Sequence, residues 1–454
     1  MSNLQEKKQR EQWSSRLGFV LAAAGSAIGL GNLWRFPYMA GQNGGGAFVA
    51  VYLGLLVLVG FTIMLAELTL GRYTQLNAIG AYKKISEKWA WVGALGVLAG
   101  FMILSFYSVV GGWVINYVIK ALTGAFNTAD MDALGGMFGS MITNPFSPIF
   151  YHAIFMILTL GIVLGGIKGG IEKYSKILMP ALFVMLFAIM LRSVTLPGAM
   201  EGVKYFLVPD WNAIDGGVIL AALGQVFFSL SLGMGCMVTY GSYIKKDENL
   251  LKSALSVPLL DTGAALLAGL AILPAVFAFG FDPAEGPGLV FVTLPAVFSQ
   301  MPLGGLFGVA FFLLVLFAAL TSAISLLEVV VAYVIDEWKW TRKKATLVIA
   351  GVIFLVGVPA SLSIGPWSGF HILPNMGIFD TLDFISGKVL LPLGGMLLAI
   401  FLGWVWGMEN AIKEATNDGK LNFALAGVWT ILIKYIAPVA IAVVFVQGII
   451  STFF

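Results

Sequence analysis

The sequence predicts an all-α membrane protein with about 11 transmembrane helices. Of its 454 residues 59% are hydrophobic and 11% are charged, whereas soluble domains carry roughly 25% charged residues. The 55 glycines suit helices that approach one another closely in lipid. Apolar runs long enough to cross a hydrocarbon core of about 30 Å recur along the whole chain. These observations exclude a soluble enzyme.

The expected spans follow one another with short connections. They cover residues 14–39, 45–71, 89–119, 150–166, 171–191, 216–241, 253–280, 303–335, 345–363, 381–408 and 424–452. Residues 1–13 are charged and polar and lead into a full-length apolar segment, so the first helix, and no cleavable signal peptide, is expected to direct insertion. The longest connection, 123–147, is polar and rich in glycine, and we expect it to be partly helical.

The distribution of basic residues predicts the orientation. With the N-terminus in the cytoplasm, about 20 Lys and Arg residues fall on inner segments and about 3 on outer segments. An odd number of spans then places the C-terminus outside. We expect a multi-pass protein of the cell's inner (plasma) membrane.

Composition also limits the chemistry. The net charge of +3 is small and dispersed, so no nucleic-acid partner is expected. One cysteine, Cys236, and two histidines are too few for a disulfide framework or a thiolate or histidine metal site. Within the spans we find no Ser/His/Asp, Cys/His or paired-acid pattern, so catalysis is not expected. The sequence does not determine the oligomeric state.

Two expected spans contain a segment that disfavours a continuous helix. Residues 25–31 hold three glycines in seven positions, and residues 229–235 of the sixth span read Ser-Leu-Ser-Leu-Gly-Met-Gly. Tight packing through small residues is the alternative explanation. The matched positions, however, indicate two inverted five-helix repeats, 14–191 and 216–408, with a site between them. The last span, 424–452, lies outside the repeats.

Interrupted helices leave backbone groups that need partners. In a membrane such groups are tolerated only where they line a site or cavity. Helix N-termini suit a carboxylate, and freed carbonyls suit an ammonium group or Na⁺. A zwitterionic amino acid together with sodium fits both requirements.

Several motifs resemble the neurotransmitter:sodium symporter family, and within it the bacterial amino-acid branch, whose members include a transporter of several hydrophobic amino acids. The motifs are Trp13 with Arg16-Leu-Gly18, Gly25–Tyr38, Asn43–Phe48, Glu67 with Gly71-Arg72, Phe227–Gly233, Thr293–Ala296 and Leu320–Ser322. Family members with twelve helices carry one more helix at the C-terminus. The resemblance implies sodium-coupled amino-acid symport. A substrate-gated cation channel and a binding-only receptor on the same scaffold stay as alternatives.

The resemblance also implies two sodium sites. The first would use the Ala27 carbonyl with Asn32, Ser229 and Asp261 and the substrate carboxylate; the second would use the carbonyls of Gly25, Ile28 and Ala318 with the hydroxyls of Thr321 and Ser322. These are hard oxygen ligands, as a hard cation requires. For the hydroxyls, bonding to a carbonyl one turn earlier is the alternative role.

The resemblance implies a substrate pocket as well. Its residues would be Ala27, Gly29, Leu30, Gly31, Ile103, Tyr107, Phe228, Ser229, Ser231, Met234, Ser322 and Leu326. Ile103 and Tyr107 share a helix face by their spacing, as do Ser322 and Leu326. Gly29 stands where amine transporters of the family carry an acid, so an amino acid is favoured over a biogenic amine. The uncharged side chains of Ile103, Phe228, Met234 and Leu326 lead us to expect a hydrophobic or aromatic amino acid as substrate.

The resemblance further implies gates at both ends of the pocket. Arg35 would pair with Asp383 on the outer side, and Arg10 with Asp336 on the inner side, with Trp13 and Tyr243 beside them. Arg10 could also be an ordinary cytoplasmic charge.

Three further residues carry expectations. Glu67 would accept hydrogen bonds from amides freed in the first interrupted helix. Gly170 and Pro180 would allow the start of the fifth helix to unwind, although a simple loop before a tolerated proline is the alternative.

Asp261 is the basis for the ion prediction. It aligns with an asparagine ligand of the family, and a carboxylate there would supply negative charge beside sodium. We therefore expect coupling to two Na⁺ ions without a chloride requirement. A structural role, in which Asp261 caps or bonds a neighbouring helix, is the alternative.

Overall fold

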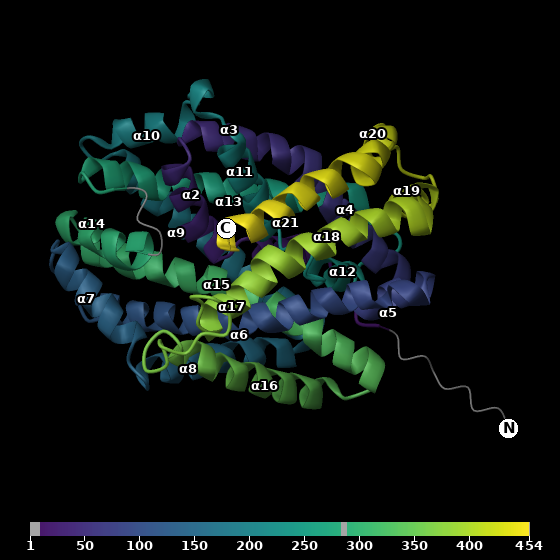
Figure 1. The fold of residues 1–454 in the computed structure, drawn as a ribbon, viewed down its shortest axis with the longest axis horizontal. Helices are drawn as coiled ribbons and strands as arrows, with labels where there is room; N and C mark the ends of the chain where they lie inside the picture. Colours follow the sequence, from purple (N-terminus) through teal and green to yellow (C-terminus); the bar gives the residue numbers. More distant parts are fainter. Residues whose placement is uncertain (1–9, 283–287, 454) are drawn as a thin grey trace.

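The computed structural model describes residues 10–282 and 288–453. Figure 1 shows a single bundle of helices that run mostly along its long axis. Within the described residues the β-structure consists of two isolated bridges, Gly45 with Pro209 and Leu373 with Met376. The predicted all-α class is confirmed. We call the end of the bundle with residue 10 the N-terminal end.

The first half of the chain contains five expected spans and the helices between them. In order they are α1 (Arg16–Ala27), η1 (Gly31–Arg35), α2 (Phe36–Gln42), α3 (Gly46–Leu55), η2 (Leu56–Gly60), α4 (Phe61–Thr74), α5 (Ala78–Ile85), η3 (Glu87–Trp89), α6 (Ala90–Leu122), α7 (Met131–Ile142), α8 (Ser147–Leu164), η4 (Ile167–Glu172), α9 (Lys173–Val194), α10 (Ala199–Leu207) and η5 (Trp211–Ala213). Helix α7 lies in the long 123–147 connection, which is partly helical as predicted.

The second half contains the other six expected spans. Its helices are α11 (Gly216–Ser229), α12 (Cys236–Gly241), α13 (Leu250–Ala278), η6 (Leu289–Thr293), α14 (Leu294–Gln300), α15 (Gly304–Trp338), α16 (Arg342–Leu362), α17 (Ile378–Asp383), η7 (Phe384–Leu390), α18 (Leu391–Ile400), η8 (Phe401–Gly407), α19 (Met408–Ala415), α20 (Ala426–Ile431), η9 (Leu432–Ile436) and α21 (Ala437–Phe453). The elements η3 and η5 are 3-10 turns, and the other η elements are π-helical segments.

The described residues contain nine helical segments that are long and apolar enough to cross a membrane, and a bent pair makes a tenth. The bent pair is α1 with η1 and α2, whose axes differ by 53°. The remaining expected span, 216–241, consists of the short helices α11 and α12. All expected spans therefore have helical counterparts, with ends that shift by a few residues.

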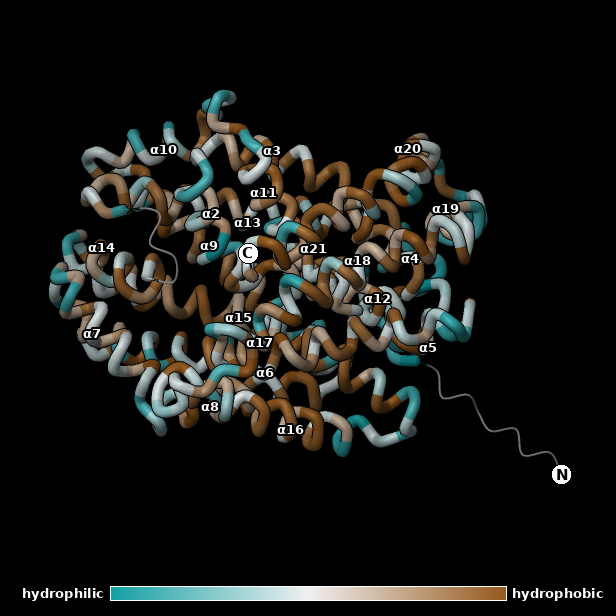
Figure 2. Tube along the Cα trace, viewed as in Figure 1, coloured by the Kyte–Doolittle hydropathy of each residue, from teal (hydrophilic) through white to brown (hydrophobic). Residues whose placement is uncertain are grey.

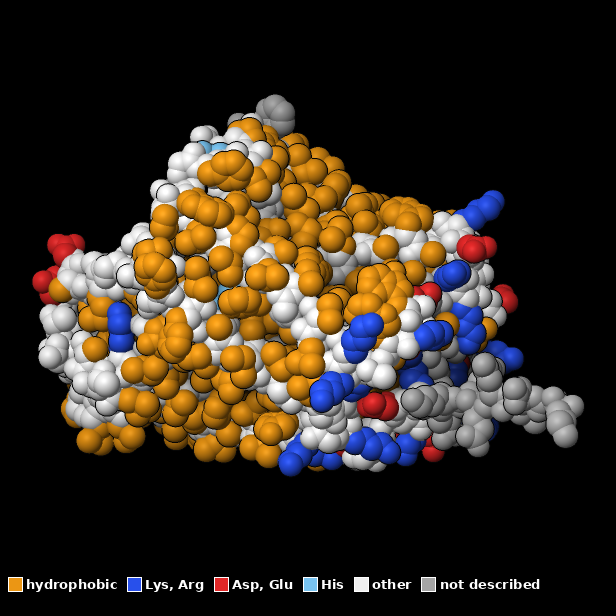
Figure 3. Space-filling model, turned by 90° about the horizontal axis from the view of Figure 1, so that it is seen from below, with side chains coloured by type: hydrophobic (Ala, Val, Ile, Leu, Met, Phe, Trp, Pro, Cys, Tyr) orange, Lys and Arg blue, Asp and Glu red, His pale blue; other side chains and the backbone are white. Residues whose placement is uncertain are grey.

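The surface is that of a multi-pass membrane protein. Hydrophobic residues dominate most helices (Figure 2), and large apolar side chains such as Val184 and Leu355 are exposed at the surface. Figure 3 shows a broad hydrophobic surface along the bundle, with Lys and Arg side chains gathered at the N-terminal end.

Local sequence signals explain several helix starts. The side chains of Ser15, Asn77, Asp215, Asn249 and Thr341 each accept a hydrogen bond from a first-turn amide of the helix that follows. Such N-caps satisfy amides that have no partner within the helix. Polar residues placed just before apolar runs thus fix where the spans begin.

The two predicted interruptions are present at residues 28–30 and 230–235. In the second, Gly233 has φ of 78°, and a Cβ atom there would lie 2.2 Å from the Leu391 carbonyl oxygen. Only glycine combines this left-handed backbone with so close an approach to another helix. The small residue therefore both breaks the helix and lets it pack against α18.

The start of the fifth span is wound in this structure. Residues 167–194 are helical as η4 and α9, and Pro180 lies inside α9. Gly166, with φ of 73°, makes the preceding turn. The unwinding predicted from Gly170 and Pro180 is therefore not present in this conformation.

Candidate functional site

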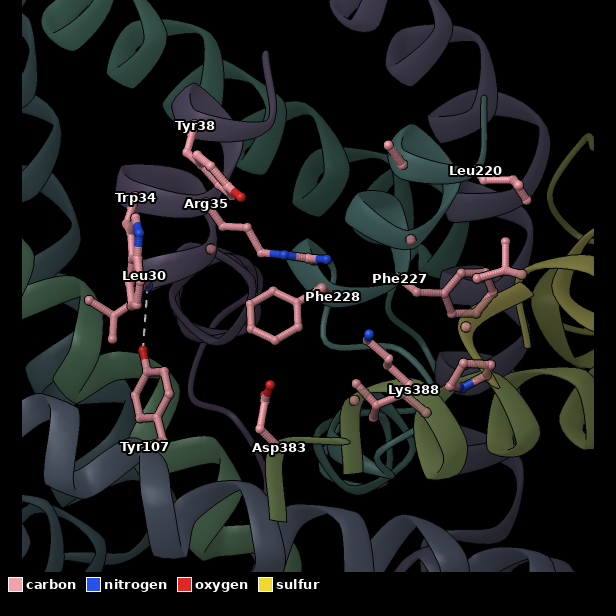
Figure 4. Close-up of a pocket in the computed structure, with 18 of the residues that line it drawn as sticks. Leu30, Trp34, Arg35, Tyr38, Tyr107, Leu220, Phe227, Phe228, Asp383 and Lys388 are labelled. Carbon is pink, nitrogen blue, oxygen red and sulfur yellow. Dashed lines mark hydrogen bonds between the residues drawn. The ribbon is translucent and has the colours of Figure 1, made fainter. Parts of the chain in front are cut away.

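A cavity of about 570 Å³ opens beside the first interrupted helix. Its walls come from η1, α2, α6, α11, α17, η7, α18 and α21, and Figure 4 shows Arg35, Asp383 and Lys388 directed into it among aromatic and aliphatic side chains. We call it the large cavity. Residues at its deep end, Leu30 and Tyr107, also line a second, smaller space.

Arg35 does not pair with Asp383 as the sequence analysis expected. Between these two described residues no ion pair is formed, and Figure 4 shows them on opposite sides of the cavity. The Arg35 Nη1 atom donates instead to Gln225 Oε1 at 3.2 Å, and the guanidinium lies 4.9 Å from the centre of the Phe228 ring. The physical reason is the width of the open cavity, which separates the charges and leaves Arg35 to neutral partners.

The smaller space, of about 40 Å³, lies at the two helix interruptions. Its lining is Ser26, Ala27, Gly29, Leu30, Gly31, Ile103, Tyr107, Phe228, Ser231, Met234, Ser322 and Leu326. The structure thus gathers every predicted substrate residue except Ser229 around one space and adds Ser26. We call it the central pocket.

Polar groups of the central pocket lie at one end. The amide of Leu30 donates to the Tyr107 hydroxyl at 3.4 Å, and Ser231 Oγ donates to the Ser26 carbonyl at 2.8 Å. A Cβ atom on Gly29 would lie 2.5 Å from Ser322 Oγ. Any side chain at position 29 would therefore reduce the space beside Tyr107.

Asn32, Ser229 and Asp261 form one hydrogen-bonded cluster, which we call the Asp261 cluster. The Asn32 Nδ2 atom donates to Asp261 Oδ1 at 2.8 Å and to Ser229 Oγ at 3.1 Å, and Ser229 Oγ donates to Asp261 at 2.9 Å. The Asp261 side chain is fully buried. The Tyr52 hydroxyl also donates to Asp261, at 3.3 Å, although sequence reasoning did not select Tyr52.

A second group of oxygen atoms lies between α1 and α15. Ser322 Oγ donates to the carbonyls of Ser26 at 3.1 Å and Gly25 at 3.4 Å. Thr321 Oγ1 donates to the Phe317 and Ala318 carbonyls of its own helix at 3.1 and 3.0 Å. Thr321 therefore has the alternative role, a hydrogen bond to a carbonyl one turn earlier in its own helix. Ser322 instead links α15 to α1. Ile28, predicted to contribute a carbonyl, is buried at the first interruption.

The predicted inner gate residues meet at the N-terminal end. Arg10 Nη1 lies 2.6 Å from Asp336 Oδ2, and the Arg10 guanidinium lies 4.7 Å from the centre of the Tyr243 ring. The Trp13 indole donates to the Tyr240 carbonyl at 3.0 Å. The N-terminal segment therefore contacts α12, the loop between α12 and α13, and α15 at this end of the bundle.

Sequence reasoning missed an extension of this network. Tyr243 donates to Glu328 Oε1 at 2.7 Å, and Arg342 Nη1 lies 2.7 Å from Glu328 Oε2. An acid inside a predicted span is expensive and normally marks function, so Glu328 could have been selected by that rule.

The expected partner of Glu67 was an amide of the first interrupted helix, and this prediction is wrong. Its Oε1 atom accepts from the Gly233 amide at 2.7 Å, so it binds an amide freed in the second interrupted helix, not the first as predicted. The cause is packing, because α4 lies against α12. The chemical role, acceptance of a freed amide by a buried carboxylate, is as expected.

Comparison with known proteins agrees with this geometry. A family model described as the sodium:neurotransmitter symporter family matches residues 10–133 and 142–453. The chain belongs to this family. It is 45% identical to the uncharacterized sodium-dependent transporter YhdH of Bacillus subtilis, over 97% of this chain and 98% of YhdH. It is 35% identical to the uncharacterized sodium-dependent transporter MJ1319 of Methanocaldococcus jannaschii, over 95% and 88% of the two chains.

A solved structure of MhsT in complex with L-phenylalanine is 49% identical, with a TM-score of 0.89 over 97% of this chain and all of MhsT. This symporter-family chain is therefore a sodium-dependent membrane transporter and no enzyme, as the sequence analysis predicted.

Proposed function

We propose that this chain takes up hydrophobic and aromatic L-amino acids by sodium-coupled symport with alternating access. The observation that carries the proposal is the central pocket, where apolar side chains meet backbone groups freed by both helix interruptions. The complex of MhsT with L-phenylalanine supports an amino-acid substrate.

The proposed substrate orientation follows from the pocket. Freed amides at the first interruption and the Tyr107 hydroxyl would bind the carboxylate, and carbonyls near Ser26 would bind the ammonium group. The side chain would extend toward Ile103, Phe228, Met234 and Leu326, none of which is charged. Because methionine adapts to different shapes, we expect Leu, Ile, Val, Met, Phe, Tyr and Trp to bind, and small or charged amino acids to bind poorly.

Two sodium ions are proposed, one at each oxygen group. The Asp261 cluster with the Ala27 carbonyl would hold the first. The carbonyls of Gly25, Ile28 and Ala318 with the hydroxyls of Thr321 and Ser322 would hold the second. All are hard oxygen donors, and the negative charge of Asp261 removes the need for chloride.

The proposed topology places the N-terminal end in the cytoplasm and the C-terminus outside, in the plasma membrane. Residues 14–191 and 216–408 are the proposed inverted repeats, and 424–452 is the additional helix. With the Arg10–Asp336 pair formed and Arg35 apart from Asp383, the structure corresponds to an outward-facing conformation in this scheme.

The proposal is tested with purified protein in proteoliposomes. Labelled L-phenylalanine should accumulate when an inward sodium gradient is imposed and should not accumulate when potassium replaces sodium. Sodium current without substrate would identify the channel alternative, and binding without accumulation would identify the receptor alternative. Strong preference for glycine or glutamate would contradict the pocket assignment.

A further inference from the structure

The N-terminal segment, residues 10–15, contacts the start of the fifth span through two carboxylates. The first is Glu172, the last residue of η4, whose side chain is 2% exposed. Its Oε2 atom accepts from the Ser14 amide at 2.8 Å. Its Oε1 atom accepts from the Ser14 hydroxyl and from Ser15 Oγ at 3.2 Å. Glu172 therefore binds the segment directly before α1.

The packing around Glu172 is equally close. A Cβ atom on Gly18 would lie 2.0 Å from Glu172 Oε1, so the first turn of α1 lies against the carboxylate. The only cation within ion-pair distance of it among the described residues is Lys176, at 2.6 Å. The N-terminal segment thus supplies most of the hydrogen bonds that a buried carboxylate requires.

The second carboxylate, Glu11, belongs to the N-terminal segment and accepts a hydrogen bond from η4. Its Oε2 atom accepts from the Ile167 amide at 2.7 Å, which is the first amide of η4. Amides at a helix start have no partner within the helix and favour negative charge. Glu11 Oε1 also lies 3.4 Å from Arg342 Nε. A residue of the N-terminal segment therefore caps the helix that Glu172 ends.

These contacts alternate with the gate contacts along the chain. Arg10 and Trp13 bind Asp336 and the Tyr240 carbonyl, whereas Glu11 and Ser14 bind η4. Because adjacent residues hold different partners, the gate residues cannot leave together without breaking the bonds to η4.

We propose that Glu11 and Glu172 are positioning residues that make release of the inner gate and unwinding of η4 a single event. When the N-terminal segment leaves, Glu172 at the end of η4 loses its bonds from Ser14 and Ser15, and the Ile167 amide at the start of η4 loses its bond to Glu11. An amide at a helix start has no other partner within the helix, so η4 is destabilised at both ends, and the glycines at 169 and 170 lower the cost of unwinding residues 167–172. The inference rests on the proposed inner gate.

The experiment measures amide hydrogen exchange of the full-length protein in nanodiscs, with sodium or potassium and without substrate. Conditions are chosen so that each opening leads to exchange, and the observed rate is then the opening rate. We compare residues 10–16 with residues 167–172 in the native protein and in the Glu172→Gln, Glu11→Gln and Ser14→Ala variants. Glu87→Gln serves as the control, because Glu87 is exposed and lies in η3, away from these contacts.

The two segments should share one opening rate in every protein. Loss of a hydrogen bond to a charged group should raise that rate about tenfold in both segments at once, and the control should match the native protein. A variant that accelerates only the segment it contacts, or unequal rates in the native protein, would overturn the inference. Because Glu11 is half-exposed, Glu11→Gln tests the proposal even if Glu172→Gln does not fold.

The uptake assay separates this inference from the proposed function. Native protein that shows equal opening rates and fails to accumulate amino acids contradicts the proposed function alone. Native protein that accumulates amino acids and shows unequal opening rates contradicts only the linked release.

Discussion

Replacement of Asp261 by asparagine tests the proposed ion site most directly. The carboxylate is fully buried and accepts hydrogen bonds from Asn32, Ser229 and Tyr52. In Asp261→Asn the amide oxygen can keep the Asn32 bond, and the hydroxyls of Ser229 and Tyr52 can rotate to accept from the new amide group. We therefore expect the fold to persist while the negative charge is lost.

The expected effect on sodium follows from the charge. Asparagine keeps a side-chain oxygen, so the loss is the difference between a contact to a charged group, about 1.5–3 kcal/mol, and a contact to a neutral group, about 0.5–1.5 kcal/mol. This difference is about 1–1.5 kcal/mol, and each 1.4 kcal/mol changes affinity about tenfold, so sodium affinity should fall roughly 5- to 10-fold. Chloride supplied in the medium should partly restore binding, because an anion nearby can replace the missing charge.

The assay is sodium-dependent binding of labelled L-phenylalanine, titrated with sodium in chloride and in gluconate. Asp247→Asn is a matched control, since Asp247 is exposed and lies in the loop before α13. An Asp261→Asn protein with native sodium affinity would refute the assignment, as would strict chloride dependence of the native protein.

Three further variants test other parts of the mechanism. Asp383→Ala removes the acid opposite Arg35 and should reduce uptake much more than equilibrium binding; native uptake would exclude this pair as the outer gate. Tyr107→Phe removes one hydroxyl and should weaken substrate binding about 3- to 10-fold, and unchanged binding would place the carboxylate elsewhere. Pro180→Ala should stiffen α9, slow exchange of residues 165–180 and slow sodium release, whereas exchange equally slow in sodium and potassium in the native protein would contradict the unwinding.

The interruptions could be predicted because glycine acts locally. Three glycines within 25–31 weaken a helix wherever it packs, and the matched segment 229–235 places both breaks at corresponding positions. The grouping of Asn32, Ser229 and Asp261 followed from the family pattern, since no spacing rule joins residues of three different spans.

The missed contacts depend on packing. Tyr52 lies in an apolar run, where a tyrosine normally belongs to the core, and only the folded arrangement brings its hydroxyl to Asp261 of α13. Glu67 was correctly expected to accept a freed amide, but the choice between two interrupted helices is made by the position of α4. Arg35 shows a third limit, because the large cavity separates it from Asp383 and leaves it bound to Gln225, and the sequence does not specify the width of that cavity.

The 53° bend of the first span has a mechanical consequence. Its two halves meet at residues 28–30 and can tilt about this point. The contacts of Arg10 and Trp13 hold the far end of the first half, and the second half carries Arg35. Residues close to this point move little when either half tilts. A ligand bound at residues 28–30 can therefore oppose or allow the tilt of either half while its own position changes little. Opening at one end of the bundle and closing at the other can then occur at different times.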